Sequence, residues 1–143
     1  MATNDNLIVR RASFLETYNL DAAVASSFVS RDLLLPPPGF VLLSVRSVFS
    51  VASTSGTFKL RKITDTSAPG AAASSTVIEL LSGAQALSGT ANTVLVATLA
   101  GSATDRRFKS GDRLAVLFSG TFTSLVGGLI QCEFGPINKY GLD

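Results

Sequence analysis

The sequence contains no histidine and no tryptophan, one cysteine, and only ten carboxylates among 143 residues. Catalysis needs a group that titrates near the working pH, a nucleophile with its base, or metal ligands that converge. Without histidine and with a single cysteine, neither a thiol-protease dyad, a zinc site nor an intrachain disulfide can be assembled. A serine nucleophile would need lysine as its base, and no Ser-x-x-Lys spacing occurs. We therefore expect no enzymatic activity, no cofactor and no metal site.

A strong charge of either sign is also missing. Twelve basic and ten acidic residues give a formal net charge of +2, and the basic residues are scattered. Nucleic-acid binding normally requires a concentrated basic surface, so nucleic acid is not an expected partner. No apolar run approaches the roughly 20 residues of a bilayer span, so we expect no membrane partner. The polar residues 1–6 do not resemble the start of a secretory signal.

Apolar residues, by contrast, are abundant. They make up 46% of the chain, against 15% for charged residues. A single domain of this length buries roughly 70% of the surface that its unfolded chain exposes, which leaves too little interior for so many apolar side chains. Part of this surface is expected to be covered by another subunit, either in a dimer or trimer or on a larger assembly.

The apolar residues recur with the period of two that is typical of β-strands. The clearest strand is predicted over residues 41–51, where Val45 and Phe49 lie on one face and Arg46 on the other. The second face still holds Leu42 and Val48, which indicates that it is partly covered. Further strands are predicted at residues 28–35, 57–63, 77–81, 93–99, 106–108, 112–119 and 129–134. Three prolines at 36–38 end the first of these, residues 66–75 are expected to form a loop, and residues 14–25 a loop with a possible short helix.

Seven to nine strands without an amphipathic helix predict an all-β fold, a single antiparallel β-sandwich or jelly roll with an N-terminal arm. We expect residues 1–25 to be the arm and linker, 26–137 the sandwich domain, and 138–143 a C-terminal tail. The predicted core consists of Val41, Leu43, Val45, Phe49, Phe58, Leu60, Leu114, Val116, Phe118, Ile130, Cys132 and Phe134.

The two ends of the chain are the expected partner-binding elements. A short apolar run lies between a polar start and two arginines, and it is too short to form its own hairpin, so it is predicted to pair with the edge of a partner. The arm and tail residues predicted to bind the partner are Leu7, Ile8, Val9, Arg10, Arg11, Lys139 and Tyr140.

The most patterned segment is residues 108–116, a Ser-Gly-Asp turn followed by a strand. The Asp112 side chain is expected to accept hydrogen bonds from turn N–H groups. Asp65, Asp105 and Asp112 lack the close spacing of a calcium loop and are interpreted as turn residues.

Together with residues 87–94 and 119–125, segment 108–116 resembles the β-sandwich and jelly-roll modules of tailed-bacteriophage virions, particularly capsid decoration or cement proteins. The resemblance covers roughly residues 40–137. It implies a structural virion protein that binds the outer face of a phage capsid, often as a dimer or trimer, and stabilises contacts between shell subunits. The implied partner is the major capsid protein or another virion protein, and the implied location is the capsid surface after assembly in the host cytoplasm. The alternative is a carbohydrate- or receptor-binding module of a tail fibre or cell surface, against which the lack of tryptophan counts.

Overall fold

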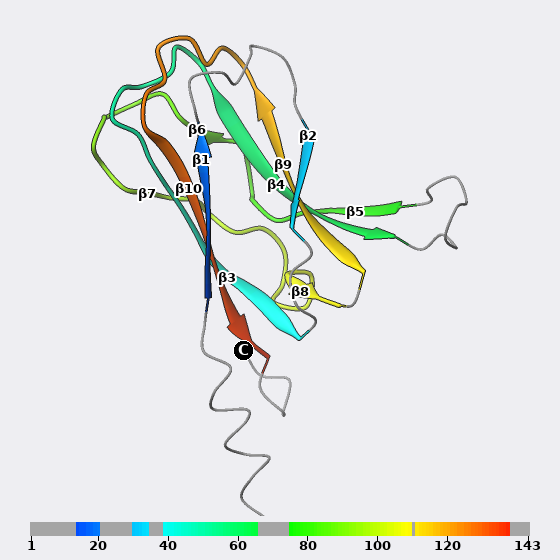
Figure 1. The fold of residues 1–143 in the computed structure, drawn as a ribbon. Coiled ribbons are helices and arrows are strands. Elements are labelled where there is room, and N and C mark those ends of the chain that lie inside the picture. Colours follow the sequence, from blue (N-terminus) through cyan, green and yellow to red (C-terminus); the bar gives the residue numbers. More distant parts are fainter. Residues whose placement is uncertain (1–13, 21–29, 35–38, 66–74, 110, 138–143) are drawn as a thin grey trace, which may run out of the picture.

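The computed structural model describes residues 14–20, 30–34, 39–65, 75–109 and 111–137 (Figure 1). Within these ranges every regular element is a β-strand, and all strand pairs are antiparallel. No helix in the described ranges is long and apolar enough to cross a membrane. The prediction of an all-β, antiparallel chain is therefore confirmed for the described residues.

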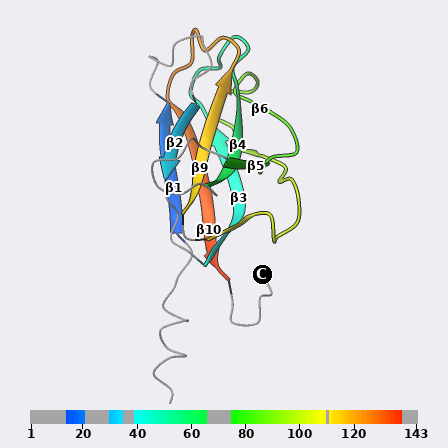
Figure 2. The same ribbon diagram turned by 90° about the vertical axis from the view of Figure 1, so that its right-hand side faces the viewer.

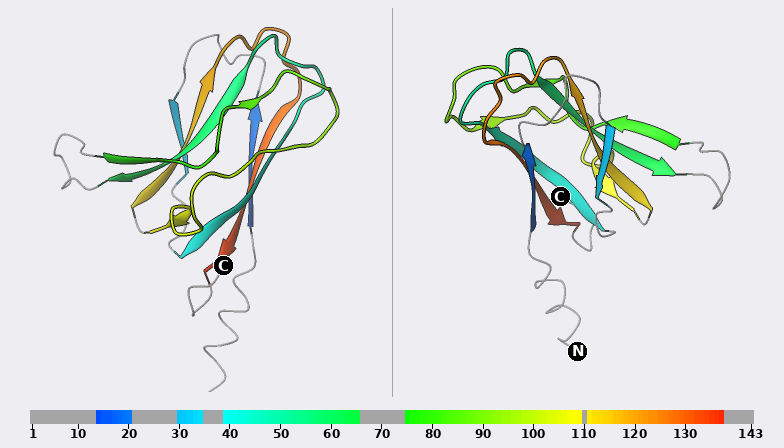
Figure 3. Two further views of the ribbon diagram at one scale, coloured as in Figure 1. Left: turned by 180° about the vertical axis from the view of Figure 1, so that it is seen from behind. Right: turned by 45° about the horizontal axis from the view of Figure 1, so that its top comes forward.

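The strands form two five-stranded sheets, which we call sheet A and sheet B. Sheet A has the order β1 (Phe14–Leu20), β10 (Gly128–Pro136), β3 (Phe40–Val48) and β7 (Leu95–Val96), with β8 (Arg107–Phe108) also paired to β3. Sheet B has the order β2 (Ser30–Leu34), β9 (Asp112–Ser119), β4 (Thr57–Asp65) and β5 (Ser75–Glu79), with β6 (Gln85–Ala86) also paired to β4. The right-hand view of Figure 3 shows β1, β3 and β10 on one side of the molecule and β2, β4, β5 and β9 on the other. Figure 2 turns sheet B toward the viewer.

Most pairings join strands that are distant in the sequence. The first strand, β1, pairs with the last, β10, and β2 pairs with β9. β3 pairs with β10, β7 and β8, and β4 pairs with β9, β5 and β6. Both sheets are thus assembled from the two halves of the chain.

Each strand predicted from the sequence overlaps an observed strand, but residues 14–20 were assigned wrongly. They form β1, which pairs with β10 along its full length, from Phe14 opposite Phe134 to Leu20 opposite Gly128. Sheet A therefore includes residues that the sequence interpretation gave to the arm and linker. The short strand β6 was not predicted. The predicted loop at 66–75 and the prolines at 36–38 lie almost entirely outside the described residues, except that Ser75 begins β5.

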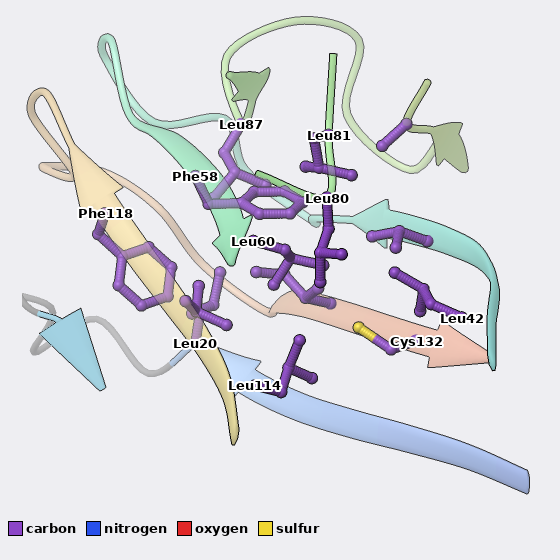
Figure 4. Close-up of a cluster of buried hydrophobic side chains, with 14 of the residues drawn as sticks. Leu20, Leu42, Phe58, Leu60, Leu80, Leu81, Leu87, Leu114, Phe118 and Cys132 are labelled. Carbon is purple, nitrogen blue, oxygen red and sulfur yellow. The ribbon is translucent and has the colours of Figure 1, made fainter. Parts of the chain in front are cut away.

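One core cluster receives side chains from both sheets (Figure 4). Phe58 and Leu60 of β4 and Leu114 of β9 are fully buried in it, together with Leu42 of β3 and Cys132 of β10. Two pairs of aromatic rings meet edge to face, Phe108 with Phe134 at 5.5 Å and Phe118 with Phe122 at 5.6 Å. Connecting segments contribute further members of the cluster, namely Leu80, Leu81, Leu87, Phe122 and Leu125.

The predicted core is confirmed with one correction, at Leu43. This side chain is 42% exposed, whereas its neighbour Leu42 is fully buried. The reason is a β-bulge in β3: Glu133 lies opposite Ser44, but the next residue, Phe134, lies opposite Leu42. The extra residue is Leu43, and it reverses the alternation of inward and outward side chains before and after it. Val41 is buried as expected, although it lies outside the main cluster.

Candidate docking surface

The residues predicted to bind a partner, Leu7, Ile8, Val9, Arg10, Arg11, Lys139 and Tyr140, lie outside the described part of the chain. The structure nevertheless describes the strands next to them. Phe14 begins β1 and lies opposite Phe134, near the end of β10 at Pro136. The predicted arm and tail are therefore attached to adjacent strands at the same end of sheet A (Figure 1).

The outer face of sheet A is defined by the residues that alternate with its core residues. Ile130, Cys132 and Phe134 are fully buried, so Leu129, Gln131 and Glu133 of the same strand point outward. The ladder places Thr17, Gln131, Arg46 and Val96 in one row across four strands, and Leu15, Glu133 and Ser44 in the next. Val94, Val48 and Leu129 surround a shallow depression of about 140 Å³ beside Arg46.

Exposed apolar side chains gather on sheet A. The large hydrophobic residues that are most exposed in the described ranges are Leu15, Leu43, Val51, Val77, Val94, Val96 and Val126. All except Val77 belong to strands of sheet A, to the segment just before β7, or to the Val51–Val126 bridge that continues the β3–β10 pair. The most exposed are Val96 at 66%, Val94 at 59% and Leu15 at 57%. Exposed apolar patches of this kind mark interaction sites in many proteins, so the outer face of sheet A is the candidate docking surface.

Sheet B differs in this respect. Ala115 and Leu117 alternate with the core residues of β9 and so lie on its outer side, yet they are 0% and 6% exposed. Leu117 also contributes to a groove of about 250 Å³ whose rim carries Lys59 and Arg61. The Arg61 guanidinium pairs with the Glu79 carboxylate of β5, with 2.5 Å between Nε and Oε1. The apolar residues on the outer side of β9 are therefore already covered, unlike Leu15 and Val96 of sheet A.

Among the described residues, the outer face of sheet A carries Arg46 and Glu133 in its central rows and Arg107 of β8 opposite Val41, toward the other end of β3. Arg46 is exposed and forms no hydrogen bond or ion pair with any described residue. Glu133 is half-buried, and its Oε2 accepts a 2.8 Å hydrogen bond from the Ser44 hydroxyl. The two lie diagonally across the β10–β3 ladder, because Gln131 lies opposite Arg46 and Glu133 lies opposite Ser44. They do not form a salt bridge with each other.

A second group of charged residues is buried at the end of sheet B. Lys62 is 6% exposed, and its ammonium donates a 2.8 Å hydrogen bond to the Arg107 carbonyl, 5.9 Å from the Phe108 ring centroid. Loss of hydration on burial lowers the pKa of Lys62, and this effect outweighs the opposing influence of Asp112 and Asp105. Among the described residues the ammonium thus contacts a carbonyl oxygen and an aromatic face.

Asp105 lies in a turn, as the sequence predicted, whereas Asp112 is not a solvated turn residue: it begins β9 and is buried, and only its predicted hydrogen bond from a turn N–H is confirmed. Asp112 accepts hydrogen bonds from the Lys109 backbone N–H at 2.7 Å and from the Thr64 hydroxyl at 2.9 Å. Asp105 accepts them from the backbone N–H and the hydroxyl of Ser102, and these bonds lower the pKa of Asp105. No group of three or more His, Cys, Asp or Glu residues in the described ranges is placed to hold a metal ion.

Sequence reasoning identified part of this surface and missed part. It noted apolar Leu42 and Val48 opposite the expected core face of residues 41–51, and inferred that this face is covered. Of these two, Val48 does lie on the outer face, whereas the bulge turns Leu42 into the core. Leu15 and Val96 were missed because they belong to β1, which was interpreted as a loop, and to the short edge strand β7. Alternation within β10 places Glu133 on the other face of the strand from Cys132, and this alternation can be read from the sequence.

Comparison with protein-family models, with curated proteins and with solved structures found no match for this chain.

Proposed function

We propose that the chain is a single jelly roll, an antiparallel β-sandwich preceded by an arm, and that it is a structural protein of a bacteriophage virion. The support for the fold is the nesting of the strand pairs: β1 with β10, β2 with β9, β3 with β8, and β4 with β5. A jelly roll is an antiparallel ribbon of this kind, wound so that its strands divide between two sheets. The further pairs β3–β10 and β4–β9 are those that the winding brings together.

In this proposal the protein binds the outer face of a phage capsid and stabilises contacts between shell subunits, without catalysing a reaction. The observation that carries the proposal is the combination of this strand nesting with exposed apolar residues that are concentrated on sheet A. Jelly rolls recur in viral capsid proteins, where sheet faces and terminal segments make contacts between subunits. The partner is a protein, either the major capsid protein or another virion protein, because the small net charge of +2 gives little attraction for nucleic acid.

The arm and the tail fit the same role. Both are attached at one end of sheet A, where Phe14 lies opposite Phe134. In the proposal, Leu7, Ile8 and Val9 add a strand to a shell subunit, and Arg10 and Arg11 pair with its carboxylates. Lys139 and Tyr140 of the tail are proposed to bind the same partner. Two terminal segments that are attached at the same end of a sheet can bind the same site on a shell.

The test uses phage particles from a culture that carries the gene for this chain. Particles are banded on a density gradient, probed with an antibody raised against the purified chain, and imaged after gold labelling. The proposal expects the chain to co-sediment with particles and the label to cover the capsid. Label confined to tail fibres would favour the receptor-binding alternative, and absence of the chain from the particle fraction would contradict a virion role.

A rebinding experiment tests the arm. Particles are stripped of the chain with mild chaotrope and incubated with recombinant full-length protein or with a variant lacking residues 1–11. The truncated chain should keep the thermal stability of the full chain but bind at least about tenfold more weakly, because it lacks the added strand. A variant in which only Arg10 and Arg11 are replaced by serine separates charge from strand pairing. Equal binding by truncated and full-length chains would show that the arm has no docking role.

A further inference from the structure

The outer face of sheet A is unusual for a water-exposed sheet because several of its exposed side chains are large and apolar. Leu15 lies on the edge strand β1 and Val96 on the edge strand β7, and both side chains are more than half exposed. The neutral residue Thr17 lies next to Leu15 on β1, and the neutral residue Gln131 lies opposite Thr17 on β10. Covering such a face removes apolar area from water, which favours association with another surface.

The charges on this face limit what that other surface can be. Between β1 and β7 the face carries one cation, Arg46, which pairs with no described residue, and one carboxylate, Glu133, which has only the neutral Ser44 hydroxyl as its described partner. Arg107 lies apart from them, on β8 opposite Val41. A covering surface of a single charge sign would leave one of the two buried against a like charge, at a considerable free-energy cost. The covering surface must therefore present an anion to Arg46 and a cation to Glu133.

A second copy of the same face meets this requirement. Consider a two-fold axis that lies in the plane of the interface, halfway between the two residues and perpendicular to the line that joins them. Rotation about this axis places Arg46 of each copy against Glu133 of the other. One contact thus forms two equivalent ion pairs and surrounds them with Leu15 and Val96. We propose that the outer face of sheet A is the interface of a symmetric dimer of this chain. This inference deepens the proposed function by naming the surface of self-association, and it rests on that function only for the expectation that the chain self-associates.

The test is a charge exchange measured by sedimentation velocity and light scattering on the purified full-length chain. The wild-type protein should have twice the chain mass of 14.9 kDa. Arg46→Glu and Glu133→Arg should each raise the dimer dissociation constant by at least about tenfold, because each creates two like-charge contacts. The double variant, Arg46→Glu with Glu133→Arg, should restore the dimer, since the exchanged charges again face each other.

Three control variants accompany the charge-exchange variants of Arg46 and Glu133. Glu133→Gln keeps an acceptor for Ser44 while removing the charge, and it should weaken the dimer less than Glu133→Arg does. Lys59→Glu reverses an equally unpaired cation on the groove of sheet B and should leave the dimer unchanged. Val96→Ser removes apolar area beside Arg46 without adding a charge, and it should weaken the dimer while leaving the charges of the ion pairs unchanged. Circular dichroism and thermal unfolding establish that each variant is folded.

Several results would overturn this proposal. A monomeric wild-type chain at about 100 µM, well above the usual dissociation constants of specific dimers, would do so. A trimer would also do so, because a face that meets itself across a two-fold axis gives only pairs. A dimer that persists in both single variants, or that folded double variants fail to recover, would place the interface elsewhere. None of these measurements involves phage particles, so failure here is separable from failure of the capsid proposal.

Discussion

At the scale of single residues, Lys62 and Asp112 are the charged side chains that the described part of the chain buries most completely. Both belong to sheet B, on β4 and β9, and both have polar partners in or just after β8, namely the Arg107 carbonyl and the Lys109 N–H. Buried polar groups are tolerated when their hydrogen bonds are satisfied. These contacts fix the turn between β8 and β9 against the end of the core.

The lowered pKa of Lys62 predicts a specific dependence of stability on pH. Its ordinary pKa of 10.5 applies to the unfolded chain, and the folded value lies below it. As the pH rises from the folded value to 10.5, the folded protein releases this proton first, so the free energy of unfolding increases over that window. Below the window Lys62 is charged in both states, and its burial opposes folding.

Urea unfolding of the wild type and of Lys62→Met, from neutral pH to just above 10.5, isolates this contribution. The difference in free energy of unfolding, wild type minus variant, should rise with pH inside the window and be constant on either side. Other titrating groups cancel in the difference. A difference that stays constant or falls with pH would show that burial does not depress the pKa of Lys62.

At the scale of elements, the bulge in β3 decides which residues meet the core. One extra residue between Leu42 and Ser44 allows Phe40 and Leu42 to face inward with Phe134, while Val45 and Phe49 also face inward further along. Without the bulge, strict alternation would put Leu43 inside and Leu42 outside. Leu42 and Leu43 have the same side chain and adjacent positions, so they form a matched pair.

Alanine substitution at these two positions should have opposite consequences. Leu42→Ala leaves a cavity in the core and should lower the free energy of unfolding by about 2–5 kcal/mol. Leu43→Ala, at a 42% exposed position, should change it by less than about 1 kcal/mol. Equilibrium urea unfolding measures both values. The reverse order of effects would mean that the bulge is misplaced.

The two glycines that flank β9 form a second matched pair at this scale. Gly120 and Gly111 have φ angles of 87° and 88°, a region that favours glycine. A Cβ at Gly120 would lie 2.2 Å from the Ser55 carbonyl oxygen, whereas a Cβ at Gly111 would meet nothing within 4 Å. Gly111→Ala should cost about 1 kcal/mol from backbone strain alone, and Gly120→Ala at least about 1–2 kcal/mol more.

Chemical denaturation of both alanine variants gives this difference directly. A serine at either position adds little beyond alanine and checks that the effect comes from the Cβ atom. Equal costs at the two positions would argue against the close approach between the β9 end and the segment around Ser55.

At the scale of the whole molecule, sheet A depends on strands from opposite ends of the chain. β10 lies between β1 and β3, and its Cys132 is fully buried in the core cluster. Because this is the only cysteine in the chain, its reaction with a thiol reagent reports the opening of that central strand. Strands held between two neighbours usually open only with global unfolding.

We expect the Cys132 thiol of the native protein to react at a rate set by global unfolding. If Leu42→Ala destabilises the fold by 2 kcal/mol, the low end of its expected range, the rate should increase by about thirtyfold. The exposed variant Leu43→Ala should react at nearly the wild-type rate. Rapid labelling of the wild type at a rate unaffected by Leu42→Ala would instead indicate that β10 detaches locally.

The sequence by itself determined the strand character of residues 41–51, 57–63, 112–119 and 129–134 and most of their core side chains. Alternation of apolar residues is a local property, and a half-buried strand must satisfy it whatever its partners are. It also determined that Asp112 serves a turn, because the carboxylate reaches backbone N–H groups only a few residues away.

Only the tertiary structure decided that residues 14–20 form a strand, that Leu43 is the extra residue of a bulge, and that exposed apolar residues gather on sheet A. Each of these depends on pairing between distant segments: β1 is held by β10, and the bulge exists only relative to the register of β10 against β3. The period of a short segment does not specify which strand it will meet or in which register. That choice is made by packing between the two halves of the chain, where the free energy of burial is gained.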